Sequence, residues 1–163
     1  MHTVPVPRRA GQPEFSSRWS GPFHMDETHW QRLADAARAA SIRAYCPYSR
    51  FPVGAAVLTG NGAIATGCNV ENASYGLTIC AERNAIFRAV ADGAKTIGAL
   101  VLYTPTPHPS APCGACRQVI AEFGADVRVR AICDGPGRID LSGSELLPHA
   151  FVLPPPGKPV SEV

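Results

Sequence analysis

Residues 97–133 read IGALVLYTPTPHPSAPCGACRQVIAEFGADVRVRAIC, and this stretch decides the fold. Two apolar runs, Ile97–Thr104 and Val127–Cys133, have the length and composition typical of buried strands. Between them the sequence predicts a short helix over Cys113–Phe123. Gly124 closes this helix, because glycine accepts the left-handed conformation in which many helices end. The unit strand–helix–strand is typical of two parallel strands in one sheet.

The preceding sequence adds a hairpin and another helix. Val53–Thr59 and Ala63–Val70 are strand-like runs on either side of Gly-Asn-Gly at 60–62, a turn signal because Asn and Gly tolerate positive φ. Ile79–Asp92 is then predicted as a helix that Gly93 closes. This alternation favours a mixed sheet with parallel strands at its centre and helices on both faces.

An amphipathic helix is predicted over residues 26–44, with Asp26 suited to the N-cap. The residues that recur after it at helical spacing are Trp30, Leu33, Ala34, Ala37 and Ser41. Near the other end, a turn at 134–137 and a helical turn at 144–147 precede a Pro-rich tail. We therefore expect a disordered leader over 1–25, one domain over 26–153 and an irregular tail over 154–163.

The composition fits one globular domain and narrows the class of ligand. The chain has 163 residues, of which 45% are hydrophobic and 17% charged. The net charge of +2 resides in the first 24 residues, and the remainder carries 12 basic and 12 acidic residues. A polynucleotide binder usually needs a basic surface, so the neutral remainder favours a small, uncharged ligand.

The same sequence argues against a membrane or secreted protein. The longest apolar run, Ile97–Tyr103, is too short to span a bilayer. Residues 1–11 lack the apolar core of a signal peptide. We expect a cytoplasmic protein with a small-molecule partner and with neither nucleic acid nor membrane as a partner.

Six cysteines lie at positions 46, 68, 80, 113, 116 and 133. Without a signal peptide, reduced thiols that bind metal or act as nucleophiles are favoured over a disulfide framework. Cys113 and Cys116 share one face of a predicted first helical turn, where Pro112 is well suited. Cys80, at the start of another helix, is the further candidate. Three thiolates leave zinc an open coordination position, which is typical of a catalytic site. A redox motif would follow the first strand of a thioredoxin-like unit, which does not match this late position, and a four-ligand structural site would need a second cysteine pair.

Glu82 follows Cys80 by two residues and is predicted to point into the protein. On its helix it shares a stripe with Ile86, Ala89 and Val90. Buried carboxylates are rare unless they are paired or functional, so the alternatives are a catalytic group and an ion pair with an arginine.

A zinc ion with three thiolates would carry one net negative charge, which opposes ionisation of a bound water. Two helix N-termini directed at the thiolates would offset part of that charge. Arg83 and Arg117 each follow a candidate ligand and would offset more, although an ordinary surface or ion-pair role is favoured for Arg117.

The segments CAE at 80–82 and PCGAC at 112–116 form the three-cysteine version of the zinc nucleobase-deaminase signature. The stretches YCPYSRFPVGAA at 45–56 and GCNVENASYGLTICAER at 67–83 extend the likeness. Over residues 26–152 the chain resembles the small, homotetrameric cytidine deaminases. The resemblance implies a three-layer α/β/α fold with a mixed five-stranded sheet. It also implies one zinc per chain and hydrolytic deamination of cytidine and deoxycytidine in pyrimidine salvage.

The resemblance further implies roles for individual residues. A zinc-bound hydroxide would attack C4 of the base while Glu82 shuttles protons. The implied zinc ligands are Cys80, Cys113 and Cys116. The implied substrate contacts are Phe51 to the pyrimidine, Asn69 and Glu71 to the ribose 3′-hydroxyl, and the Ala81 backbone to the base. Arg83 would bond to ligand thiolates. Tyr75, and an aromatic that Phe151 matches, would reach a site across a subunit interface.

Other functions stay open beside this one. A deaminase of a related aminated base or drug, of the blasticidin type, shares the zinc motif. A polynucleotide editor would need a basic groove with stacking platforms. A non-catalytic zinc module would not need an inward Glu82. Ordinary packing or capping roles for Phe51, Asn69, Glu71 and Tyr75 are the simpler alternatives. Cys46, Cys68 and Cys133 are predicted to be inert buried thiols, and the five histidines surface residues.

Overall fold

A computed structural model describes residues 25–153 of the chain, and the predictions for residues 1–24 and 154–163 lie outside this range. The strands are β1 (Gly54–Thr59), β2 (Ile64–Cys68), β3 (Ile97–Tyr103), β4 (Arg128–Ile132) and β5 (Arg138–Ser142). The helices are α1 (Glu27–Ser41), α2 (Ala81–Ala91), α3 (Gly114–Glu122) and α4 (Gly143–Leu146), with a 3-10 turn η1 (Tyr75–Leu77). No helix in the described range has the length and apolar character needed to cross a membrane.

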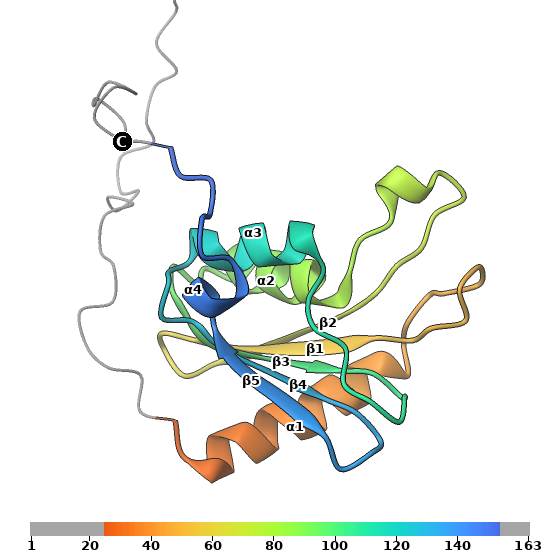
Figure 1. Cartoon of the computed structure of the whole chain (residues 1–163), viewed down its shortest axis with the longest axis horizontal. Helices are drawn as coiled ribbons and strands as arrows, with labels where there is room; N and C mark the ends of the chain where they lie inside the picture. The colour runs from red at the N-terminus through yellow and green to blue at the C-terminus, as the bar shows by residue number, and fades with distance from the viewer. Residues whose placement is uncertain (1–24, 154–163) are drawn as a thin grey trace, which may run out of the picture.

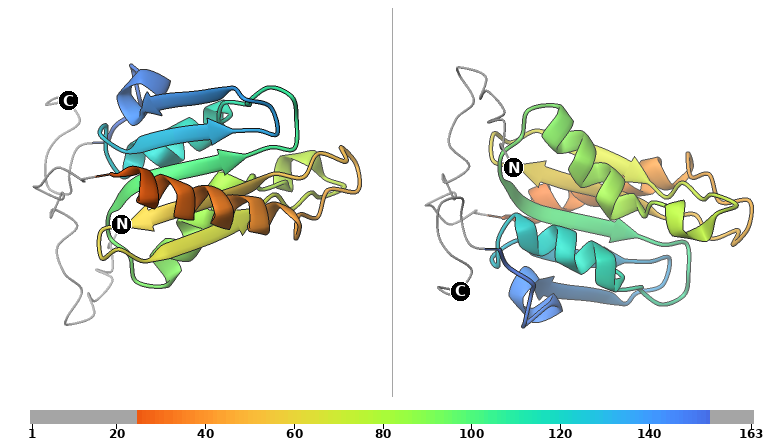
Figure 2. Two further views of the ribbon diagram at one scale, coloured as in Figure 1. Left: turned by 90° about the horizontal axis from the view of Figure 1, so that it is seen from below. Right: turned by 90° about the horizontal axis from the view of Figure 1, so that it is seen from above.

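The strands form one mixed sheet in the order β2-β1-β3-β4-β5 (Figure 1). The pair β3–β4 is parallel and every other pair is antiparallel. Helix α1 covers one face of the sheet, and α2 and α3 lie side by side on the other, as the two views of Figure 2 show. The predicted three-layer α/β/α fold with a mixed five-stranded sheet is therefore confirmed.

Several element boundaries differ from the sequence prediction. Helix α1 ends at Ser41 rather than at 44. Cys80 and Cys113 are N-cap residues, so both ligand helices begin one residue or more after the predicted start. Pro112 consequently precedes the N-cap and is not in the first turn of α3. The strand β5 was not predicted from the pattern, although Ile139 and Leu141 alternate with polar residues in it.

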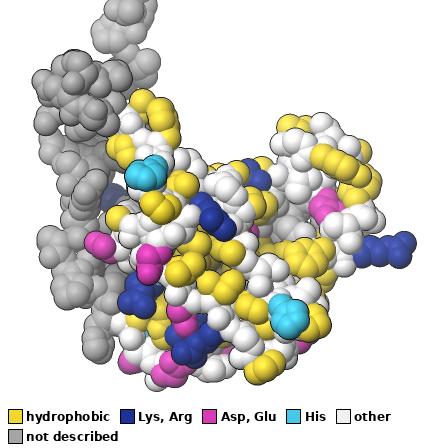
Figure 3. Space-filling model, in the orientation of Figure 1, with side chains coloured by type: hydrophobic (Ala, Val, Ile, Leu, Met, Phe, Trp, Pro, Cys, Tyr) yellow, Lys and Arg dark blue, Asp and Glu magenta, His cyan; other side chains and the backbone are white. Residues whose placement is uncertain are grey.

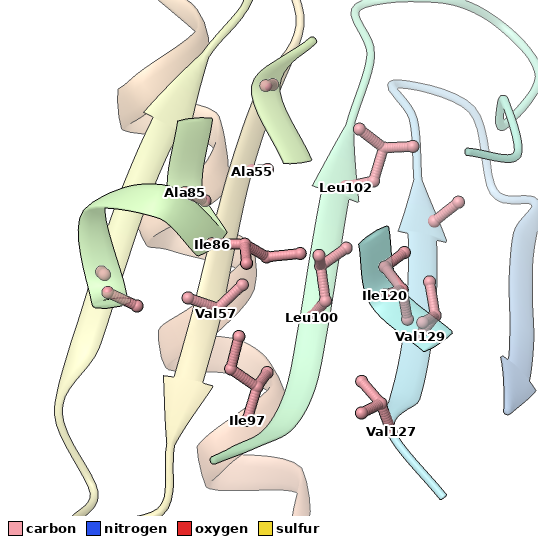
Figure 4. Close-up of a cluster of buried hydrophobic side chains, with 14 of the residues drawn as sticks. Ala55, Val57, Ala85, Ile86, Ile97, Leu100, Leu102, Ile120, Val127 and Val129 are labelled. Carbon is pink, nitrogen blue, oxygen red and sulfur yellow. The ribbon is translucent and has the colours of Figure 1, made fainter. Parts of the chain in front are cut away.

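The central strand β3 is buried along its whole length because helices cover both faces of the sheet. Its side chains alternate between two hydrophobic clusters. Leu100 and Leu102 pack with Ile86 of α2 and Ile120 of α3, as Figure 4 shows for this cluster. Val101 belongs to the opposite cluster, which α1 closes with its buried residues Trp30, Leu33 and Ala37.

Two glycines allow the hairpin strands to approach the helices closely. A Cβ atom at Gly67 of β2 would lie 2.3 Å from the backbone nitrogen of Ala85 and 2.6 Å from the carbonyl oxygen of Ala81, both in α2. A Cβ atom at Gly54 of β1 would lie 2.0 Å from the carbonyl oxygen of Ala37 in α1. The position of each helix on the sheet therefore depends on the absence of a side chain at one glycine.

Candidate metal centre

Three cysteine thiols meet where two helices begin. Cys80 is the N-cap residue of α2, Cys113 is the N-cap residue of α3, and Cys116 lies in the first turn of α3. Their sulfur atoms all lie within 4.8 Å of one another. Among the described residues this is the one group of three or more potential ligands close enough to share a metal ion.

The spacing of the thiols fits a tetrahedral zinc ion. The Sγ atoms of Cys80 and Cys113 are 3.8 Å apart. Zinc–sulfur bonds of about 2.3 Å in a tetrahedron place two sulfurs about 3.8 Å apart. Three thiols fill three corners of the tetrahedron, and the fourth corner stays available for a water molecule or substrate.

The surroundings of the cluster favour the ionised form of the Cys80 thiol. The pKa of Cys80 is lowered to about 5, chiefly by a hydrogen bond from Cys116, with contributions from Arg83 and Cys113. The hydrogen bond to Cys80 and burial raise the pKa of Cys116, because the two thiols share a proton. Both helix N-termini add positive potential at this point. Zinc binding would release the shared proton, so metal affinity and pH are linked here.

The two arginines that follow ligands have different contacts. Arg83 donates through Nη2 to the carbonyl oxygen of Thr78 at 3.0 Å and to the Cys80 sulfur at 3.6 Å. Arg117 instead donates to the carbonyl oxygens of Pro112 at 2.8 Å and Leu146 at 3.2 Å. Arg83 is therefore placed to offset thiolate charge, whereas Arg117 ties the start of α3 to the end of α4.

Glu82 lies in the first turn of α2 and is only 4% exposed. Burial is the main cause of its raised pKa, and Cys80 and Cys116 are among the other groups that shift it. The carboxyl group therefore lies beside the thiols and out of bulk water. Ile86 and Ala89 share its buried stripe, as predicted, but the prediction for Val90 was wrong, since that side chain is 45% exposed. Phe87, three residues earlier, is also half exposed, so this side of α2 faces away from the sheet.

Asn69 and Glu71 lie on the segment that follows β2 and contact the loop before β1. Asn69 Oδ1 accepts a hydrogen bond from Val53 N at 2.8 Å, and Asn69 Nδ2 donates to the Phe51 carbonyl oxygen at 2.9 Å. Glu71 accepts hydrogen bonds from the backbone of Tyr48 and from Ser49. The structure thus brings Phe51, Asn69 and Glu71 together.

This segment also adjoins the metal ligands. Val70 and Ile79 exchange backbone hydrogen bonds of 2.9 and 3.0 Å, which places the residue before Cys80 beside the one between Asn69 and Glu71. Ala81 follows as the fully buried first residue of α2. The predicted nucleoside contacts and the thiol cluster therefore share one side of the molecule.

Two predicted interface aromatics are exposed in the isolated chain. Tyr75 in η1 is 76% exposed and Phe151 is 69% exposed. The backbone of Phe151 is held by Gln118 of α3, whose Nε2 donates to its carbonyl oxygen at 2.8 Å and whose Oε1 accepts from its N–H at 3.1 Å. The sequence analysis missed Gln118 and Ser49. For Gln118, the one feature of the sequence that could have indicated a role was its position two residues after the ligand Cys116.

The remaining cysteines lie apart from the cluster. Cys133 is buried, and its thiol lies 3.3–3.6 Å from the carbonyl oxygens of Pro107, Gly135 and Gly137. Cys68 donates to the carbonyl oxygen of Arg43. All six cysteines are free thiols. The prediction of a buried thiol is confirmed for Cys133 and wrong for Cys46 and Cys68, which are half-buried because Cys46 lies in the loop before β1 and Cys68 ends the edge strand β2.

A family profile described as the cytidine and deoxycytidylate deaminase zinc-binding region matches residues 27–132, which include all three clustered cysteines and Glu82. The chain belongs to this family. Its curated deaminase relatives include the cytidine deaminase of Halalkalibacterium halodurans, 49% identical over 123 residues that cover 74% of this chain and 92% of the relative. The predicted resemblance is confirmed.

Solved structures of deaminases give the same result for the fold. The cytidine deaminase from Burkholderia pseudomallei matches with a TM-score of 0.71 and 47% identity, over 74% of this chain and 98% of that one. A blasticidin-S deaminase from Bacillus cereus is a more distant relative, 31% identical over 114 residues that cover 63% of this chain. A zinc-binding deaminase domain agrees with the thiol cluster, so the predicted zinc cofactor is confirmed.

Proposed function

We propose that this deaminase acts on free cytidine and deoxycytidine and converts them hydrolytically to uridine and deoxyuridine in pyrimidine salvage. The observation that supports this proposal most strongly is the three-thiol zinc site with a buried carboxylate, Glu82, two residues after the first ligand. Cys80, Cys113 and Cys116 would hold one zinc ion per chain. When bound, zinc supplies the Lewis acidity that activates water near neutral pH.

Glu82 is the proposed proton carrier. The reaction adds water at C4 and releases ammonia, so protons must pass from water to the ring and to the leaving amine. Glu82 lies beside the thiol cluster in the first turn of α2, and burial raises its pKa. A raised pKa favours a carboxyl group that both accepts and returns a proton near neutral pH.

The proposed nucleoside contacts are Phe51 for the pyrimidine ring, the Ala81 backbone for the base, and Asn69 with Glu71 for the ribose 3′-hydroxyl. Glu71 is an acceptor when ionised, and a sugar hydroxyl can donate to it. A 3′-phosphate would instead bring negative charge against this carboxylate, and residues 68–79 contain no Lys or Arg to neutralise it. The site therefore favours nucleosides over 3′-phosphorylated nucleotides and over DNA or RNA chains.

We propose a homotetramer in which neighbouring subunits complete each site. Tyr75 and Leu77 are exposed on the projecting η1 segment, where apolar side chains gather in Figure 3. The Tyr75 ring packs edge-on against the ring of Tyr48 at 6.0 Å, beside the loop that carries Phe51. Phe151 is a further exposed aromatic that Gln118 holds in place. Covering these aromatics with a second copy would bury apolar surface and close the nucleoside site.

The blasticidin-type alternative shares the zinc site and differs in what surrounds it. The pairing of Asn69 with the Phe51 backbone supports a nucleoside site, because it joins the proposed sugar and base contacts in one unit.

We further propose that the enzyme works in the cytoplasm, since three thiolates that hold zinc must stay reduced.

The test is a spectrophotometric assay of the purified full chain. Ultraviolet absorbance should fall when cytidine or deoxycytidine is added, and a chelator should abolish the change. Cytidine 3′-monophosphate and blasticidin S are the comparison substrates, and light scattering gives the number of chains per particle. Efficient turnover of the 3′-phosphate, or a preference for blasticidin S, would contradict the proposed substrate.

A further inference from the structure

Ser49 occupies a central place between the two proposed nucleoside contacts. Its hydroxyl donates to Glu71 Oε1, and its backbone N–H donates to Glu71 Oε2 at 3.2 Å. The same hydroxyl oxygen accepts a hydrogen bond from the backbone N–H of Phe51 at 3.1 Å. One small side chain therefore links the sugar-binding carboxylate to the backbone of the base-binding aromatic.

These bonds use most of the capacity of the Glu71 carboxylate. Tyr48 N also donates to Oε2, at 2.9 Å, so the carboxylate accepts three hydrogen bonds from residues 48 and 49. An ionised carboxylate has about four acceptor positions. About one position remains for a substrate hydroxyl, and the direction in which it points is fixed by the other three bonds.

The turn that supplies these donors is itself held in shape. Arg50 N donates to the Cys46 carbonyl oxygen at 3.0 Å, and Arg50 has a φ of 54°, in the left-handed region that side chains other than glycine rarely adopt. Glu71 N donates to the Tyr45 carbonyl oxygen at 2.8 Å. Both the backbone and the side chain of Glu71 are thus tied to the turn over residues 45–50.

We propose that Ser49 is a positioning residue that holds the Glu71 carboxylate in the orientation that receives the ribose 3′-hydroxyl. This inference rests on the proposed function, in which Glu71 binds that hydroxyl. The hydrogen bond from the Ser49 side chain is also the main cause of the lowered pKa of Glu71, so the same contact favours the ionised form of the carboxylate.

The experiment compares cytidine with 3′-deoxycytidine, which lacks the hydroxyl in question. Ser49→Ala should lower kcat/KM for cytidine about 10-fold and for 3′-deoxycytidine by less than about 3-fold, because only the first substrate uses the oriented carboxylate. Ser49→Thr keeps the hydroxyl and should restore the wild-type preference. Ser144→Ala, an exposed serine in α4, is the matched control and should change neither value.

Glu71→Gln separates the inference from the function on which it rests. If Glu71→Gln abolishes the preference for cytidine while Ser49→Ala retains it, the proposed ribose contact stands and the role of Ser49 is overturned. In the Glu71→Gln background, Ser49→Ala should have little further effect on the preference, since contacting residues that act as one unit are not additive. A wild-type enzyme that does not distinguish the two substrates would overturn both ideas.

Two further outcomes decide against the inference. An equal loss on both substrates with full zinc content would mean that Ser49 supports only the loop backbone. Unchanged kcat/KM values for both substrates in Ser49→Ala would mean that the other two donors to Glu71 suffice. If Ser49→Ala does not fold, Ser49→Cys provides the same comparison, because a thiol has a similar size and donates weakly.

Discussion

Replacing Gly67 with Ala should damage catalysis through the position of α2, without touching a functional side chain. The added methyl carbon would lie 2.3 Å from the Ala85 nitrogen and 2.6 Å from the Ala81 carbonyl oxygen, whereas ordinary contacts begin near 3.4 Å. The strand and the helix must therefore separate by roughly 1 Å. Because these contacts are to helix backbone, no side chain can rotate away to absorb the strain.

A displacement of this size has a predictable cost at the metal centre. Cys80, Ala81 and Glu82 all lie at the start of the helix that must move. A misplacement of about 1 Å in catalytic geometry can lower the rate about 100-fold. Overpacking of a core typically costs about 1–3 kcal/mol of unfolding free energy. We expect Gly67→Ala to show both effects and to retain zinc less well than the wild type.

Gly54→Ala is the matched control, since its methyl would lie 2.0 Å from the Ala37 carbonyl oxygen and would press on α1. That helix lies on the opposite face of the sheet and carries none of the proposed site residues (Figure 2). Urea unfolding should show a comparable loss of stability in both variants. Zinc content and kcat, measured where both proteins are folded, should fall sharply only in Gly67→Ala. Equal catalytic losses in the two variants, or wild-type kcat in Gly67→Ala, would refute the reasoning.

Three other perturbations test the site and the fold. Glu82→Gln should keep fold and zinc but lower turnover at least about 100-fold, because Gln cannot carry a proton; metal analysis and the cytidine assay on one sample check this. Cys113→Ala should lose zinc, whereas Cys133→Ala should retain about one zinc per chain by metal analysis. Asp26→Ala should destabilise the protein at pH 7, because Asp26 caps α1 by accepting from His29 N. The stability difference should narrow as pH falls through the lowered pKa of Asp26, below 3.8, because that stabilisation depends on the ionised carboxylate; urea titrations across this range measure it.

The sequence predicted local structure best where a short pattern of residues is compatible with only one kind of turn or helix end. Asp26 is the N-cap of α1 as predicted, and the Gly-Asn-Gly signal does join two antiparallel strands. The strand β5 was missed because an amphipathic edge strand of five residues has few apolar positions, and its alternation of Ile139 and Leu141 is weak beside a preceding turn. The order of strands also could not be predicted, since β1 inserts between β2 and β3 through contacts distant in sequence.

The same distinction applies to the site. Cys80 with Glu82, and Cys113 with Cys116, each lie at one helix start, where spacing along the chain determines spacing within the pair. The meeting of the two pairs, 33 positions apart, does not follow from local spacing. The network around Glu71 joins residues more than 20 positions apart, so local spacing says nothing of Ser49. The predicted roles of Phe51, Asn69 and Glu71 came from the family resemblance, and the structure adds that they are linked to one another.

The complete burial of β3 has a consequence for how the molecule fluctuates. Its backbone pairs with β1 on one side and with β4 on the other, and helices shield both faces, so its amide protons should exchange with solvent only when the whole domain unfolds. The loops over residues 45–51 and 70–78 lack such cover and should exchange through small local openings. Deuterium labelling would then divide the protein into a slow part that carries the ligand helices and a fast rim that carries the proposed nucleoside contacts Phe51 and Glu71.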